Sequence, residues 1–255
     1  MVTDTERRIY EFIQKNAGVR SQDIINHLRH NPTGVFRHLK KMQENHRIYK
    51  VGKPPKVRYY GYAKSMKQQS NLITDAIDWA VSGDRSMLPA DQFCQTRDVF
   101  QARTDRLIND LKKLRKNDDF VYLLVAAVGE IGNNSFDHNI GHWQDIPGIF
   151  FGLDVVGREI VLADRGQGVY ATIKRVRPEV ESDVDALRIA FTEMVSGREP
   201  ERRGNGLKFV KKVIEENRLH LTFYSGGAMV EITGDGMTQH NSEIKIPGTL
   251  AHLKF

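Results

Sequence analysis

The sequence contains a single cysteine, Cys94, which excludes an internal disulfide and a cysteine cluster for zinc. It has no apolar run close to the roughly 18 residues that a membrane-spanning helix needs. Its first residues lack the apolar stretch of a secretory signal. We therefore expect a protein of the reducing cytoplasm with no membrane partner. The P-loop pattern G-x-x-x-x-G-K-[ST] is also absent, which excludes a nucleotide site of that class.

The charge of the chain is distributed unevenly. Of its 255 residues, 40% are hydrophobic and 27% are charged, a composition that suits one large or two modest folded domains. Residues 1–64 carry 14 basic and 5 acidic side chains, a net charge of +9, whereas the remainder carries 24 and 27, a net of −3. This asymmetry predicts a polyanionic partner for the first quarter of the chain alone.

Residues 4–63 show helical periodicity followed by strand-like runs. Apolar positions recur at helical spacing in 4–15, 21–28 and 33–45, and in the last of these we expect the inward side chains to be Val35, Phe36, Leu39 and Met42. Two β-rich runs then surround a basic tip at 52–56. This order resembles the winged helix-turn-helix of bacterial transcription regulators, and we assign residues 1–63 to such a domain.

The resemblance implies that the third helix enters the major groove of double-stranded DNA while the hairpin touches the backbone. The predicted DNA-contacting residues lie on the outer side of that helix and in the hairpin: Thr33, Arg37, His38, Lys41, Lys53, Lys56 and Arg58. Arg37 and His38 are the candidates for base edges, and the lysines supply salt-dependent phosphate contacts. A winged helix that binds a protein is the alternative.

Residues 64–118 are predicted to form a helical connector, because NLITDAIDWAV and FQARTDRLINDLKKLRK are both amphipathic. We interpret them as packing helices that lead into the next domain. A pair of dimer-forming helices, and hence a homodimer, is the alternative. No histidine occurs from residue 63 to residue 137, which bears on any kinase activity.

The helical run that follows Asp119 places Glu130 and Asn134 four residues apart, on one face. A carboxylate and an amide on a mostly buried helix are costly unless a polar group meets them. Mg²⁺ meets that need, because it accepts one or two side-chain oxygens and takes its other ligands from phosphate and water. The neighbouring carboxylate would then deprotonate or orient a nucleophile.

Glycine-containing motifs occur at the ends of two later elements, the end of a strand and the start of a helix. One strand ends in Asp164-Arg165-Gly166-Gln167-Gly168, where the aspartate can accept a hydrogen bond from adenine but not from the guanine carbonyl. Further on, Gly204-Asn205-Gly206-Leu207 opens a helix whose N-terminus suits phosphate, and Arg198, Arg202 and Arg203 precede it. The chain closes with Pro247-Gly248-Thr249 before a last strand.

Taken in order, these four motifs resemble the GHKL superfamily of Bergerat-type ATPases. That superfamily includes gyrase-type ATPases, heat-shock chaperones, sensor histidine kinases and anti-sigma-factor serine kinases. The segment EIGNNSFDHN looks closest to the last two branches. The resemblance implies an α+β two-layer sandwich over 119–255, with helices on one face of a mixed sheet.

The same resemblance implies the ligands and their residues. ATP and Mg²⁺ would be the cofactors. Glu130 would be the catalytic residue and Asn134 the metal ligand; the remaining nucleotide contacts would be Asp164, Gly166, Gly168, Arg203, Gly204, Gly206, Leu207 and Thr249. One departure is Asp137, where many sensor kinases carry a lysine or arginine that helps to hold phosphate.

These motifs leave several functions open. The first is a transcriptional regulator in which ATP switches the geometry of the DNA-binding domain. The second is a protein kinase that acts on a separate partner, by resemblance a STAS-like protein. A standard histidine kinase is disfavoured, because the stretch before the ATPase motifs lacks the phosphoacceptor histidine. The third is a partner-binding module that retains nucleotide without turnover.

Overall fold

The computed structural model divides the chain into two compact units, Met1–Gln69 with Val81–Arg85 and Ser70–Ala80 with Ser86–Phe255. The residues that the structure describes are 3–16, 18–28, 30–44, 48–51, 57–61, 71–82, 91–114, 117–194 and 205–255. Within these ranges, no helix combines the length and apolar character needed to cross a membrane.

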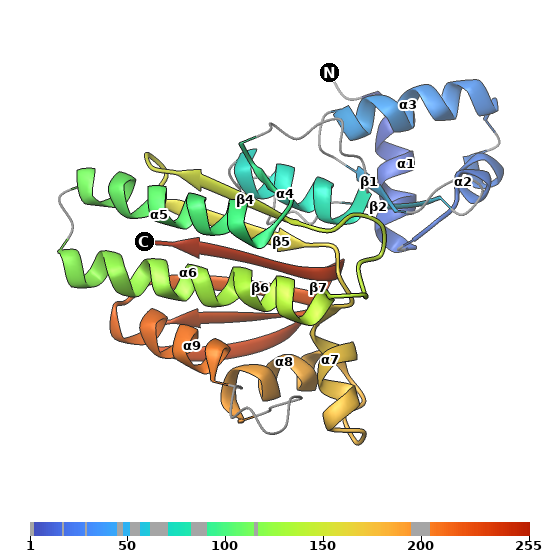
Figure 1. Ribbon diagram of the computed structural model, residues 1–255. Helices are drawn as coiled ribbons and strands as arrows, with labels where there is room; N and C mark the ends of the chain where they lie inside the picture. Colours follow the sequence, from blue (N-terminus) through green and yellow to red (C-terminus); the bar gives the residue numbers. More distant parts are fainter. Residues whose placement is uncertain are drawn as a thin grey trace. The chain divides into compact units, whose positions relative to one another are not determined.

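The first unit contains helices followed by a short hairpin, in the order expected from the sequence (Figure 1). Its elements are α1 (Asp4–Lys15), α2 (Ser21–Leu28), α3 (Pro32–Glu44), and the antiparallel strands β1 (Ile48–Val51) and β2 (Arg58–Gly61). Their apolar sides meet in one core, whose buried residues are Ile9, Ile13, Val19, Ile24, Leu28, Val35, Leu39, Met42, Ile48 and Tyr59.

The third helix differs from expectation at one position. Val35, Leu39 and Met42 are buried as predicted, but Phe36 is 48% exposed, so its assignment to the core is wrong. Successive residues on a helix are about 100° apart, and the core of this unit covers only the face centred on Val35 and Leu39. Phe36 therefore lies at the edge of that face, in solvent.

A buried carboxylate joins α1 to α3. Glu6 is 3% exposed and forms a capping box with Thr3 at the start of α1. From α3, Lys41 Nζ lies 2.9 Å and His38 Nδ1 lies 3.4 Å from Glu6 Oε1. The hydrogen bond from Lys41 is the main cause that lowers the pKa of Glu6. One side chain therefore caps the first helix and holds the third helix against it.

We predict that Glu6→Ala destabilises this unit by about 1–3 kcal/mol at neutral pH, because it removes a buried acceptor and half of the capping box. The folded-state pKa of Glu6 is lowered, so its stabilisation is complete above the ordinary value of 4.5 and is lost as the pH falls from there towards the lowered pKa. Hydrogen exchange of the α1 and α3 amides at neutral and acid pH measures the effect.

The matched control is Asp4→Ala, which removes an exposed carboxylate that pairs with Arg7 in the same turn. Exposed pairs contribute at most about 1 kcal/mol, so this variant should change the exchange rates little. Equal effects of the two substitutions would contradict the role assigned to Glu6.

The second unit is built on a five-stranded sheet in the order β3-β4-β5-β7-β6. The strands are β3 (Phe93–Cys94), β4 (Ile149–Asp154), β5 (Glu159–Asp164), β6 (His220–Thr233) and β7 (Gly236–Lys254). Every neighbouring pair is antiparallel, so the expectation of a mixed sheet is wrong for the described residues. The reason lies in the connections: β4–β5 and β6–β7 are joined by direct hairpins, which force antiparallel pairing.

Helices cover both faces of this sheet. On one face, α5 (Arg97–Lys113), α6 (Asp118–Asn139) and α9 (Gly206–Glu216) pack over a large core that includes Phe100, Leu124, Phe151 and Leu162 (Figure 1). On the other face lies α4 (Asn71–Ser82), whose Trp79 contacts Phe150 at 6.3 Å between ring centroids. The prediction of helices on one face is therefore wrong, because Phe150 points away from its neighbour Phe151 and has its own helical cover.

The stretch predicted as a connector, residues 64–118, contributes to the second unit. Residues 71–80 of α4 and the whole of α5 belong to that unit. Cys94 is fully buried there, and burial raises the pKa of its thiol to about 11. The thiol is therefore protonated at neutral pH and is a core side chain rather than a nucleophile.

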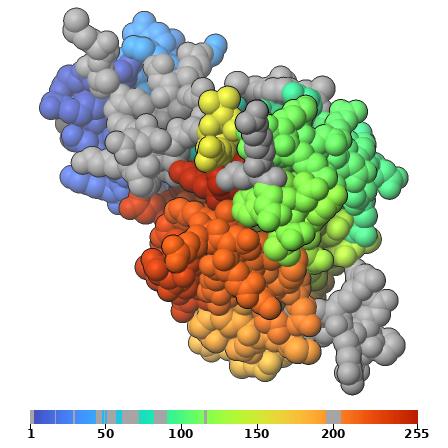
Figure 2. Space-filling view, turned by 90° about the vertical axis from the view of Figure 1, so that its left-hand side faces the viewer, coloured from blue at the N-terminus to red at the C-terminus, as the bar shows by residue number. Residues whose placement is uncertain are grey.

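Two shorter helices follow β5. They are α7 (Gly168–Val176) and α8 (Asp183–Thr192), and α8 packs against both β6 and α9. In the space-filling view, the pale orange surface of α8 lies beside the deeper orange surface of α9 (Figure 2). These two helices and α6 lie around the end of the sheet where β5 ends.

Candidate functional site

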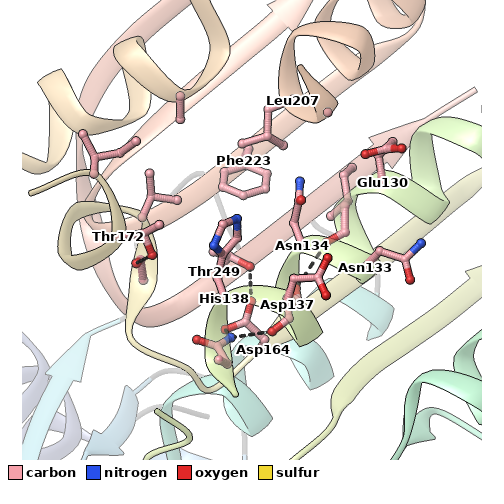
Figure 3. Close-up of a pocket in the computed structure, with 18 of the residues that line it drawn as sticks. Glu130, Asn133, Asn134, Asp137, His138, Asp164, Thr172, Leu207, Phe223 and Thr249 are labelled. Carbon is pink, nitrogen blue, oxygen red and sulfur yellow. Dashed lines mark hydrogen bonds between the residues drawn. The ribbon is translucent and has the colours of Figure 1, made fainter. Parts of the chain in front are cut away.

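A cavity of about 1280 Å³ lies in the second unit, between α6, α7, α9 and the ends of the central strands. Most of the residues predicted to bind nucleotide line it: Glu130, Asn134, Asp164, Gly168, Gly206, Leu207 and Thr249 (Figure 3). Two others, Arg203 and Gly204, lie outside the described residues, as do Arg198 and Arg202. The fold thus brings together side chains that are far apart in the sequence.

One wall of the cavity is the second half of α6. The helix begins after Asn117, whose side chain caps it by accepting a hydrogen bond from Asp119 N–H. Glu130 and Asn134 project from the same side of this helix, Glu130 exposed and Asn134 half-buried (Figure 3). The prediction that the two side chains share one helical face is confirmed, whereas Glu130 is exposed and so has no burial cost for a ligand to offset.

A buried carboxylate lies beside the C-terminal end of α6. Asp164 ends β5 and is 1% exposed. Its Oδ1 accepts hydrogen bonds from Gly166 N–H at 2.9 Å and from Asn139 Nδ2 at 3.1 Å, while its Oδ2 accepts one from the Thr249 hydroxyl. Burial raises the pKa of Asp164, and these neutral donors act in the opposite direction. In the described part of the chain, the groups that donate hydrogen bonds to Asp164 are neutral.

Sequence reasoning missed Asn139, the last residue of α6. Its Nδ2 donates to Asp164 Oδ1 and, at 2.8 Å, to Ser135 O, and its Oδ1 accepts from Gln167 N–H at 3.0 Å. Asn139 therefore fixes both the carboxylate and the turn that follows β5. The available signal was an amide at a buried position of an apolar helix, which requires a polar partner.

Close backbone approach explains two of the predicted glycines. A β-carbon at Gly166 would lie 1.9 Å from Asn139 Oδ1, and one at Gly206 would lie 2.5 Å from Glu130 Oε2. Any side chain at position 206 would also crowd Asn134, since its β-carbon would lie 3.3 Å from Asn134 Nδ2. The N-terminus of α9 therefore lies close to the Glu130–Asn134 pair, and a side chain at position 206 would require Glu130 to move.

A cation from outside the predicted motifs also reaches the cavity. Arg97, the first residue of α5, lines the cavity and forms an ion pair with Asp137. Asp137 was noted as a departure from the kinase pattern because a basic residue was expected there. The structure places a guanidinium beside that carboxylate, from a residue 40 positions earlier in the chain. Sequence spacing gives no indication of such a contact.

The predicted DNA-contacting residues are only partly at the surface of the first unit. Thr33 and Arg37 are exposed on α3, and Arg58 is exposed on β2, where its Nη1 donates to Gly18 O at 2.8 Å. The His38 side chain is only 17% exposed and faces Glu6, and Lys41 binds the same carboxylate from the helix surface. Lys53 and Lys56 lie outside the described residues.

Comparison with known proteins identifies the first unit. Residues 2–49 match the family of winged helix-turn-helix DNA-binding domains. No curated protein and no solved structure gave a match to the chain. The match covers α1, α2, α3 and the start of the hairpin, in agreement with the arrangement described above. The N-terminal part of the chain is therefore a winged helix-turn-helix.

We predict that Gly166→Ala lowers the free energy of unfolding of the second unit by about 1–3 kcal/mol, because the new methyl group displaces the Asn139 amide from Asp164. The control is Gly129→Ala in α6, where a β-carbon would meet no atom within 4 Å. That substitution should stabilise the helix by about 0.5–1 kcal/mol. Denaturant unfolding of both variants measures the difference; a tolerated Gly166→Ala would show that the turn is not closely packed.

Proposed function

We propose that this chain is a DNA-binding regulator whose second unit binds ATP with Mg²⁺. The observation that carries the nucleotide proposal is the Asp164 carboxylate, buried at the cavity wall with only neutral hydrogen-bond partners named around it. A buried anion of this kind is costly unless a ligand donor or its own dipoles compensate it. The exocyclic amine of adenine is such a donor, whereas guanine offers a carbonyl at that position.

The shape and lining of the cavity support a purine nucleotide. Its volume of about 1280 Å³ exceeds the roughly 300–1,000 Å³ of common small-molecule sites. Apolar side chains from α7, α9 and β6 line the same cavity as Asp164: Val169, Ile173, Leu207 and Phe223. A flat base next to these side chains would bury apolar area while its amine reaches the carboxylate.

The donor set on α6 fits a magnesium–phosphate group. The Asn134 amide would supply one oxygen ligand, as Mg²⁺ requires few protein ligands when phosphate and water complete its shell. The N-terminus of α9 lies close to Asn134 and would direct backbone N–H groups at phosphate. When bound, the metal would neutralise phosphate charge. Glu130 would accept the proton of an attacking water or hydroxyl group, since its carboxylate is exposed at the same wall.

We predict that ATP with Mg²⁺ raises the melting temperature of the full chain and that GTP raises it much less. Asp164→Asn should remove most of the ATP-dependent shift, because it replaces the acceptor for the amine with a group that also donates. Asp235→Asn, an exposed carboxylate in the β6–β7 turn, is the control and should leave the shift unchanged. Equal stabilisation by GTP would refute the adenine assignment.

A second candidate function is a protein kinase that acts on a separate, STAS-like partner. The observation in its favour is that Glu130 is exposed at a cavity open enough to admit a hydroxyl group from another protein. Incubation with γ-labelled ATP separates the alternatives. Label on a partner indicates a kinase, label released as phosphate indicates a hydrolysing switch, and label in neither indicates a nucleotide-retaining module.

For the first unit, we predict that the full chain binds duplex DNA with an affinity that falls steeply as salt rises, because basic side chains displace condensed counterions. Lys53→Ala and Lys56→Ala should weaken binding to all sequences alike, whereas Arg37→Ala should also relax sequence preference.

If ATP switches the regulator, DNA and ATP must change each other's affinity by the same factor. Titrations of DNA with and without ATP, and of ATP with and without DNA, test this coupling. If neither affinity changes when the other ligand is present, the proposed ATP switch is refuted.

A further inference from the structure

The exposed side of α3 carries a stripe of side chains at helical spacing. Thr33, Phe36, Arg37 and Lys40 stand at positions i, i+3, i+4 and i+7, and all four are exposed. Residues at this spacing share one face of a helix. This stripe (Thr33, Phe36, Arg37 and Lys40) lies opposite the buried row of Val35, Leu39 and Met42.

Phe36 is the unusual member of the stripe. A large aromatic side chain that is 48% exposed in the middle of a helix leaves apolar surface in water. An exposed phenylalanine alone does not identify a partner. Its neighbours Arg37 and Lys40 do, because two cations beside an apolar ring suit a surface that is anionic and carries apolar groups.

Two of the four α3 side chains predicted to contact DNA, His38 and Lys41, are turned towards α1. His38 faces Glu6 and is mostly buried, and the ammonium of Lys41 is held by the same carboxylate. Both therefore belong to the α1 side of the helix. The face of α3 left for a partner is the stripe, which contains Phe36 and Arg37 but not His38.

We propose that Phe36 reads thymine in the major groove through the 5-methyl group, with Arg37 and Lys40 contacting base edges or phosphates on either side. The major groove exposes the thymine methyl as its only apolar feature, and phenylalanine is among the side chains that contact it. This inference rests on the DNA binding proposed above and adds a base preference to it. A docking site for another protein is the competing explanation.

The test uses the full chain. Duplexes that bind at moderate salt are selected from a random library, and each thymine of the selected sequence is then replaced by deoxyuridine, which lacks only the methyl group. The wild-type chain should lose about threefold to tenfold in affinity at one or more positions, the effect of exposing one buried methyl. Phe36→Ala should bind both versions equally, with an unchanged salt dependence, and Phe36→Leu should retain the preference.

The matched control is Tyr122→Ala, which removes a similarly exposed aromatic ring, 51% exposed, from α6 in the second unit. It should keep the preference for thymine. A Phe36→Ala variant that still distinguishes thymine from deoxyuridine would overturn the inference, and so would a wild-type chain that binds DNA without distinguishing them. A chain that binds no duplex at all would instead refute the DNA-binding proposal, and would favour a protein partner for the stripe.

Discussion

The burial of one carboxylate, that of Asp164, organises the second unit. A charged group in an apolar interior is tolerated only when donors surround it, and the donors here come from three parts of the chain. Asn139 is the end of α6, Gly166 belongs to the turn after β5, and Thr249 lies on β7. Because all three donors must reach Asp164, their hydrogen bonds hold α6, the turn after β5 and the strand β7 in fixed positions relative to one another. The cavity is the space that remains in front of that junction.

The glycines around the site are a consequence of the same junction. Position 166 has no room for a methyl group, because the Asn139 amide that bonds Asp164 occupies the space. A β-carbon at Gly248 would lie 2.3 Å from Asp164 Oδ1, so the strand that carries Thr249 also approaches the carboxylate closely. Glycine motifs that are spread over about eighty residues of sequence thus serve one local requirement, close packing around a buried anion.

Local patterns predicted much of this molecule, and long-range contacts account for what they missed. The helices of the first unit and the Glu130–Asn134 pair could be predicted because each depends on spacing within one helix. Phe36 was misplaced because periodicity marks an apolar face without fixing how much of that face the core covers. The mixed sheet was implied by the resemblance to the GHKL superfamily, and it is wrong because hairpins join β4 to β5 and β6 to β7, so that these strands pair in the antiparallel direction.

The site residues that sequence reasoning missed make their contacts with residues far away in the sequence. Asn139 meets Asp164 across 25 positions and Arg97 meets Asp137 across 40, and nothing in the local sequence of Arg97 distinguishes it from a solvated helix residue. Likewise, the cover of the second sheet face comes from α4, in a segment that reads only as an amphipathic connector. Such contacts follow from the fold and become visible only with it.

Three buried carboxylates in this chain show why one of them is suited to a ligand. Glu6 is neutralised by Lys41, and the pKa of this carboxyl group is lowered. Glu159 is paired with His252 at 2.8 Å, both side chains being buried. Asp164 differs, because its named partners are neutral donors and burial raises its pKa.

Glu159 keeps a buried Oε1 without a hydrogen-bond partner in the described part of the chain, but it does not line the cavity. Glu6 does not line the cavity either, and it already has Lys41 as a cationic partner. Asp164 has no such partner among the contacts described, and of the three it is the one that borders the cavity.

A hydrogen-bond donor that enters this cavity would stabilise the ionised form of Asp164 and be held in one orientation by a carboxylate that the fold has fixed. Because apolar side chains such as Val169, Ile173 and Phe223 share this wall with the polar ones, a flat molecule with a donor at its edge would gain apolar contacts as well as the hydrogen bond. A small cation would gain no such contacts, and its own desolvation would offset much of the attraction.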